Sequence, residues 1–278
     1  MMVIDDKKMA KVATSFQIPV KPQILTDLQR LLDTAEPDID KIAVLISNDV
    51  GLSSSILKLV NSPFYGMKRK SSKIKQAVMM LGLETISGLI SALLLKSAFK
   101  GTSSISLERF WDDSLDVANA MAFVAQRVKN KMSVDILYTI GLFQNCGIPL
   151  LAQKFDDYKD ILIEANSSGV NSIQLEEENY QTNHAVLGYY VASSWHLPKE
   201  ICELILRHHE IAFLSKISGN KEQLAFATLK VADNLVERVK RRCDSPDWIQ
   251  SQRDALNVLG LSVSDYEDLK DEYVELFE

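Results

Sequence analysis

The sequence is poor in glycine, proline and cysteine. Eleven glycines and seven prolines among 278 residues are few, which disfavours a fold rich in tight turns and favours helices. The three cysteines, Cys146, Cys202 and Cys243, form no CxxC pair, so neither a zinc ribbon nor a disulfide framework is predicted. The first residues also lack the apolar run of a secretory signal. We therefore expect a protein of a reducing compartment, with a cytoplasmic localisation.

Basic residues are not in excess either. The formal net charge is −6, and residues 262–278 hold seven acids and one lysine, a difference of six, so the rest of the chain is balanced. A strongly basic nucleic-acid-binding domain is thus excluded as the default, and nucleic acid is not expected as a partner. Local basic clusters at 68–75 and 238–242 could still bind an anion, although cations at a helix end explain the second more simply.

No segment is expected to cross a membrane. Residues 136–153 carry no charge over 18 positions, which is long enough for a span by length alone. However, the second half of this stretch contains Gln144, Asn145, Gly147 and Pro149, whose polar groups and helix breaks do not suit hydrocarbon. We predict a helix in a protein core, broken near Gly147–Pro149.

Apolar residues recur with helical spacing along almost the whole chain, and no convincing β-alternation is found. The predicted fold class is therefore all-α, in two lobes at 16–100 and 106–243, followed by an acidic helical tail at 244–278. We expect the tail to dock on its own chain rather than on a partner, because it carries a single apolar stripe. The stripe comprises Val263, Tyr266, Leu269, Tyr273 and Leu276.

Three of the four histidines are candidates for a metal site. His184 opens a predicted helix, His208 and His209 close another, and Asp233 lies on the helix after that. Imidazoles and a carboxylate from facing helices are how a helical bundle builds a metal site. Alternatively, adjacent histidines at a helix end interact with its last carbonyl groups. Spacing alone leaves both possibilities open.

A family resemblance covers residues 16–209 and rests on several separated segments. The most characteristic is LKLVNSPFYG at 57–66, preceded by IPVKP at 18–22 and LISND at 45–49. The second lobe adds HAVLG at 184–188, WHLP at 195–198 and the pair His208–His209. Together these segments resemble the HDOD domain, a bacterial relative of the HD-domain metal-dependent phosphohydrolases. The resemblance implies an HD-like helical bundle in the second lobe.

The departures from the hydrolase pattern are informative. HD enzymes carry an adjacent His-Asp pair that binds metal, whereas this chain has Gln144–Asn145 there, and Asp113 in place of an earlier histidine. Neutral amides are poor ligands for transition metals, so we expect a degenerate site with no metal, no cofactor and no catalytic residue, and Gln144 and Asn145 as satisfied buried amides. The vestigial candidates are Asp113, His184, His208, His209 and Asp233.

The expected function follows from this resemblance and its departures. The chain resembles a non-catalytic module of bacterial signal transduction that acts through protein–protein contacts, with proteins of bacterial signalling as partners. The alternative is a residual metal-dependent phosphohydrolase acting on a nucleotide or cyclic dinucleotide. The metal content of the purified protein separates the two. The sequence sets no oligomeric state.

Overall fold

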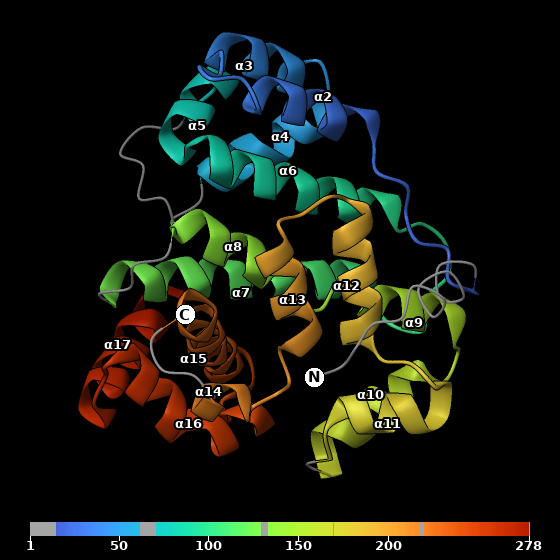
Figure 1. The fold of residues 1–278 in the computed structure, drawn as a ribbon, viewed down its shortest axis with the longest axis vertical. Coiled ribbons are helices and arrows are strands. Elements are labelled where there is room, and N and C mark those ends of the chain that lie inside the picture. Colours follow the sequence, from blue (N-terminus) through green and yellow to red (C-terminus); the bar gives the residue numbers. More distant parts are fainter. Residues whose placement is uncertain (1–14, 62–70, 129–132, 169, 217–219, 278) are drawn as a thin grey trace. The chain divides into compact units, whose positions relative to one another are not determined.

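The computed structural model describes residues 15–61, 71–128, 133–168, 170–216 and 220–277 (Figure 1). Within these ranges every regular element is a helix and there is no strand, which confirms the predicted all-α class. The chain divides into two compact units. Of the described residues, those between 20 and 99 form the small unit, and 15–19 together with those from 100 onward form the large unit.

The small unit is built from five labelled helices that pack on one another. Asp38 starts the second of them, because its side chain accepts hydrogen bonds from the backbone N–H groups of Asp40 and Lys41. The core of the unit includes Ile86 and Leu95, which are almost fully buried. Its helices are α2 (Gln23–Leu32), α3 (Ile39–Ser47), α4 (Val50–Val60), α5 (Ile74–Leu81) and α6 (Leu83–Ala98).

The characteristic 57–66 motif is only partly within the described residues, because 62–70 fall outside them. Asn61, Pro63 and Gly66 favour a chain reversal at 61–66, which therefore remains a prediction. Asn61 is described, and its side chain joins the two ends of the segment. Its Nδ2 donates to the Ser71 carbonyl at 2.8 Å, and the Ser71 backbone N–H donates back to Oδ1 at 2.6 Å.

The large unit is centred on two long helices, α7 (Leu107–Arg127) and α15 (Lys221–Arg241), which pack against each other. Every residue of 117–125 is buried, so the middle of α7 lies in the core. Some of the other helices of the unit contact this pair, and the rest pack on those helices. They are α8 (Val134–Phe143), α9 (Ile148–Lys154), α10 (Tyr158–Ser168), α11 (Ser172–Tyr180), α12 (His184–Ser194), α13 (Lys199–Arg207), α14 (Phe213–Lys216), α16 (Pro246–Leu259) and α17 (Val263–Phe277).

The uncharged stretch at 136–153 is broken as predicted, because α8 ends at Phe143 and α9 begins at Ile148. Among the described residues, no single helix is long and apolar enough to cross a bilayer. Helices α5 and α6 pass the same length and composition test only as a pair, bent by 117°.

Gly147 allows α9 and α12 to approach closely. A Cβ atom at this position would lie 2.0 Å from the carbonyl oxygen of His184 and 2.6 Å from the backbone nitrogen of Gly188. No side chain fits in that space. The backbone of the first turn of α12, where His184 lies, therefore packs directly against Gly147.

The acidic tail docks on its own chain, as its apolar stripe predicted. Helix α17 contacts α7 and α15, and Tyr266, Leu269 and Tyr273 are buried. The prediction was wrong for Val263 and Leu276, which lie near the two ends of α17 and are 62% and 55% exposed. The apolar face that packs is thus limited to the middle of the helix.

Ionic and aromatic contacts also hold the tail in place. Arg127, at the end of α7, donates through Nε to Glu272 at 2.7 Å and lies over the ring of Phe123 at 3.5 Å. Phe123 in turn packs edge-to-face on Tyr273, with ring centroids 5.1 Å apart. One end of α7 thus contacts the tail through both charge and aromatic packing.

Candidate functional site

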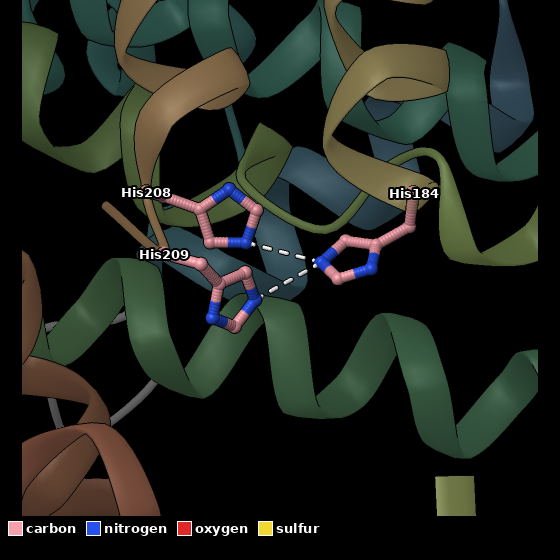
Figure 2. A group of neighbouring side chains, drawn as sticks. All are labelled: His184, His208 and His209. Carbon is pink, nitrogen blue, oxygen red and sulfur yellow. Dashed lines mark hydrogen bonds between the residues drawn. The ribbon is translucent and has the colours of Figure 1, made fainter. Parts of the chain in front are cut away.

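Three of the four histidines converge in the large unit. His184 is the first residue of α12, and His208 and His209 directly follow α13. Figure 2 shows their rings turned toward one another. Nε2 of His184 lies 3.2 Å from Nε2 of His208 and 3.1 Å from Nε2 of His209. The fourth histidine, His196, is exposed and does not belong to this three-histidine cluster.

Local helix signals place these rings. Asn183 caps α12, because its side chain accepts from the backbone N–H of Val186 at 2.8 Å, and this puts His184 in the first turn. The backbone N–H of His184 donates to Glu176 at 2.7 Å. At the other side, the helix of residues 199–207 stops just before His208 and His209, so both rings leave the same helix end.

Each ring is held from behind through its Nδ1 atom. His184 Nδ1 lies 2.8 Å from both oxygens of Glu176, His208 Nδ1 lies 2.6 Å from the carbonyl of Ile205, and His209 Nδ1 lies 3.0 Å from Asp247. Such outer partners orient an imidazole and fix which nitrogen carries the proton. The three Nε2 atoms are left facing the centre of the cluster.

The two carboxylates behind the cluster are themselves paired. Glu176 on α11 is fully buried and also accepts from the Tyr158 hydroxyl at 2.6 Å. Burial alone would raise the pKa of Glu176, but the neighbouring His184 outweighs it and the pKa is lowered. Asp247 on α16 accepts from the buried Lys230 at 2.6 Å. Burial opposes ionisation there too, yet Lys230 and His209 hold the pKa of Asp247 far below its usual range.

Burial favours the neutral form of two of the histidines. It lowers the pKa of His208 well below the ordinary value, with further lowering by the neighbouring His209. The pKa of His209 is also lowered by burial, against the opposing effect of Asp247. Neutral imidazoles have the lone pair that a metal ion needs.

Gln144 and Asn145, at the position of the His-Asp pair, lie beside the cluster. Gln144 Nε2 donates to Asp233 on α15 at 2.7 Å, and Asn145 Oδ1 lies 3.1 Å from Nε2 of His208. Burial raises the pKa of Asp233 to about 6. The expectation of satisfied amides holds for only one end of Gln144, because its Oε1 is buried without a partner among the described residues.

Asp113 lies outside the histidine cluster and forms an ion pair instead. Its carboxylate pairs with Lys240 on α15, which also pairs with Asp116. Neither Asp113 nor Asp233 belongs to the group of ligand atoms that lie within 4.8 Å of one another. Of the five vestigial candidates, the structure therefore brings the three histidines together and leaves both acids outside their cluster.

The basic clusters are largely neutralised where they are described. Besides Lys240, Arg241 pairs with Glu237, and Arg238 lies 3.6 Å from Asp244, the first residue of the predicted tail. In the small unit Lys75 pairs with Asp40 at 2.6 Å. Residues 68–70 of the first cluster lie outside the described residues.

A cavity of about 440 Å³ opens beside the cluster. His208, His209, Gln144 and Asn145 contribute to its wall. Charged side chains line it as well. They are Arg109, Asp113, Asp233, Glu237, Lys240, Arg241 and Asp247. Its volume falls in the range of small-molecule sites, and the site contains groups that could hold a cation and groups that could hold an anion.

Sequence reasoning missed the residues that hold the cluster from behind. Glu176 belongs to an acidic run at 176–178 that resembles a solvated helix face, yet it is completely buried. Lys230 is only 1% exposed, although lysine is almost never buried unless it is paired. A usable signal existed for Asp247, which follows Pro246 in the first turn of a helix, a position that favours acids.

The fold and the site define an all-helical protein with a histidine-lined cavity in its larger unit. The sequence model of the HDOD domain matches residues 18–211. The chain therefore belongs to the HDOD domain family. It is 25% identical over 195 residues to an uncharacterized protein of Treponema pallidum (strain Nichols), covering 70% of this chain but only 38% of that protein.

Several crystal structures share the fold. An HDOD domain protein of unknown function from Geobacter sulfurreducens is 24% identical and matches with a TM-score of 0.68 over 97% of each chain. A candidate phosphohydrolase from Shewanella amazonensis SB2B gives 18% identity and a TM-score of 0.71 over 94% of this chain and 91% of its own. A candidate signal transduction protein from Marinobacter aquaeolei VT8 is 17% identical and matches with a TM-score of 0.69. The match covers 95% of this chain and 58% of that protein.

Proposed function

We propose that this chain is a regulatory module of bacterial signal transduction that works by contacting another protein and does not hydrolyse a phosphoester. The observation that carries the proposal is the Gln144–Asn145 pair. Where a related hydrolase has His-Asp, Gln144 donates an N–H to Asp233 at 2.7 Å. An amide cannot bridge two metal ions, and this amide already engages the nearest carboxylate.

A second carboxylate is engaged as well. Asp113 stands where the resemblance places an earlier histidine, and it is paired with Lys240. Hydrolysis by a two-metal centre needs carboxylates that are free to bind both ions. With Asp113 and Asp233 both engaged, the residues at these positions support binding better than turnover.

The contact mode draws support from the small unit. Among the described residues, five of the ten large apolar side chains that are exposed lie in residues 20–80. Val50 is 78% exposed and Met79 is 63% exposed. The small unit thus carries half of these exposed side chains in less than a third of the chain, and this is the reason for placing the proposed contact there.

Hydrolysis can be tested directly with the purified full chain. The protein is loaded with Mn²⁺ or Fe²⁺ and offered bis(p-nitrophenyl) phosphate, nucleoside phosphates and a cyclic dinucleotide. We expect no more product than from a His208→Ala variant prepared in the same way. Turnover that the His208→Ala variant loses would overturn the non-catalytic proposal and favour a phosphohydrolase.

The contact can be tested in living cells. A photo-reactive residue placed at Met79 should give a discrete crosslinked product with another protein, whereas the same residue at Ile249, an exposed position in the large unit, should not. Equal crosslinking at both positions, or at neither, would contradict the proposed contact through the small unit.

A phosphohydrolase acting on a nucleotide or cyclic dinucleotide is the second candidate. The cavity favours it, because His209 and Asp233 line the same space as Arg109 and Lys240. Cations near a ligand phosphate are common in such enzymes. A double change, Gln144→His with Asn145→Asp, restores the His-Asp pair. A hydrolytic rate that appears only in this variant would identify the pair as the missing element and support the non-catalytic state of the natural chain.

A further inference from the structure

The three histidines present lone pairs rather than protons to one another. Each Nδ1 atom faces an acceptor, namely a carboxylate for His184 and His209 and a backbone carbonyl for His208. Each Nδ1 therefore carries the hydrogen, because an acceptor can be satisfied only by a donor. In a neutral ring the Nε2 atom is then an acceptor.

Acceptors thus crowd the centre of the cluster without a matching donor. The Nε2 atoms lie 3.1 and 3.2 Å apart, and Asn145 Oδ1 lies 3.1 Å from Nε2 of His208. His184 and His208 are each 1% exposed, so solvent does not separate these atoms. Buried acceptors without donors are unfavourable unless a cation lies between them.

The spacing suits one transition-metal ion. With a metal–nitrogen distance of about 2.0–2.1 Å, two imidazole nitrogens are about 2.9 Å apart at a right angle and about 3.4 Å apart at a tetrahedral angle. The two Nε2 separations from His184, 3.1 and 3.2 Å, fall between these limits. Carboxylates behind two of the rings, Glu176 and Asp247, are the partners that metal-bound histidines commonly have.

The local charge also favours a cation. Glu176 and Asp247 bring two carboxylates to the back of the cluster, within 2.8 Å of His184 Nδ1 and 3.0 Å of His209 Nδ1. Lys230 is the cation that pairs with one of them, Asp247. Glu176 accepts from the Tyr158 hydroxyl and from His184, and among the described residues no lysine or arginine pairs with it. A buried anion of this kind requires compensation.

We propose that His184, His208 and His209 bind one divalent transition-metal ion of the imidazole-preferring class, such as Zn²⁺, through their Nε2 atoms. The ion ties the first turn of α12 to the end of α13. This site goes beyond the proposed regulatory function and does not depend on it. It also departs from the absence of metal that was expected from the sequence. That expectation rested on the missing His-Asp pair, whereas the proposed ligands include neither the Gln144 position nor Asp113 and Asp233.

The competing state is a proton. If His184 were an imidazolium, its Nε2–H could donate to both of the other rings, and rotation of the Asn145 amide would turn its N–H groups toward His208. That state needs no metal and satisfies the same distances. Metal binding and protonation of His184 are mutually exclusive at Nε2, so direct binding experiments separate them.

The test uses the full chain after treatment with a chelator and dialysis. Titration with Zn²⁺ should show one equivalent bound per chain and a rise in melting temperature. Titration with Co²⁺ should produce the visible absorption of a cobalt ion in a low-coordinate site. His209→Gln should weaken binding at least about 100-fold, and Asp247→Asn about 10- to 100-fold, because the latter only orients the ring.

Two controls isolate the site. His196→Asn removes the exposed histidine at a residue with φ of 61°, which asparagine tolerates, and should bind Zn²⁺ like the parent. Cys243→Ser, at an exposed cysteine outside the cluster, should also bind like the parent. Circular dichroism of each variant checks that it is folded. Failure of the folded parent to bind Zn²⁺ or Co²⁺, or binding that survives His209→Gln, would overturn the metal site.

Discussion

Gly147→Ala should be among the most damaging small changes in the large unit. The added Cβ would lie 2.0 Å from the carbonyl oxygen of His184 and 2.6 Å from the backbone nitrogen of Gly188. Cβ atoms essentially never approach other heavy atoms below 3.0 Å, so α9 and α12 must separate by about 1 Å. Gly147 has φ of −81°, which alanine adopts freely, so the penalty is entirely one of space.

Backbone atoms on both sides cannot swing away as a side chain could. Overpacking of a tight core typically costs 1–3 kcal/mol, and this site belongs at the upper end, at about 3 kcal/mol. For a unit of this size that corresponds to a fall in melting temperature of about 6–12 °C. Thermal unfolding followed by circular dichroism measures this shift.

Gly51→Ala is the matched control, because the same substitution is made where space exists. Gly51 is exposed in α4, and its Cβ would meet only the Asp49 side chain at an ordinary 3.4 Å. Alanine is the better helix former, so this variant should be unchanged or more stable by about 0.5 kcal/mol. Equal melting temperatures for Gly147→Ala and the parent would refute the steric argument.

Three further changes test the charges and the tail. Lys230→Met should lower the free energy of unfolding by about 3 kcal/mol, because it removes the buried lysine that pairs with Asp247. The exposed Lys199→Met should stay within about 0.5 kcal/mol of the parent, and urea unfolding measures both. Burial raises the pKa of Asp233 to about 6, so between about pH 4 and 6 the unfolded chain loses a proton that the folded chain keeps. The free energy of unfolding should therefore fall as the pH rises through this range. Asp233→Asn should remove this dependence, and denaturation at several pH values measures it. Deleting 263–278 should lower the melting temperature and increase binding of an apolar dye; unchanged melting would contradict the packing seen for the tail.

The helical fold could be predicted because apolar residues repeat at helical spacing and because glycine and proline mark the breaks. The break after Phe143 follows from Gly147 and Pro149, and the tail was placed from its apolar stripe. The prediction was wrong at the two ends of the stripe, Val263 and Leu276. Spacing shows which face of a helix is apolar, but it does not show how far along the helix the partner surface extends.

The histidine cluster was only partly predictable. Rare residue types in helix-end positions singled out His184, His208 and His209, and the structure brings them together. Nothing in the spacing could show that Asp113 pairs with Lys240, because that contact depends on how α7 and α15 cross. Glu176 was missed because it belongs to a run of three glutamates, and nothing in that run indicates that one of them is buried.

The hydrogen-bonded pair of Asn61 and Ser71 gives the small unit a suitable position for an insertion. Its two hydrogen bonds fix the distance between the ends of 62–70 independently of the length of chain that joins them. When the added chain is flexible, doubling the length of the connection costs only about 0.6 kcal/mol of closure entropy. An affinity peptide inserted between these two residues should therefore leave the helices on either side folded, whereas Asn61→Ala would remove both bonds that allow this tolerance.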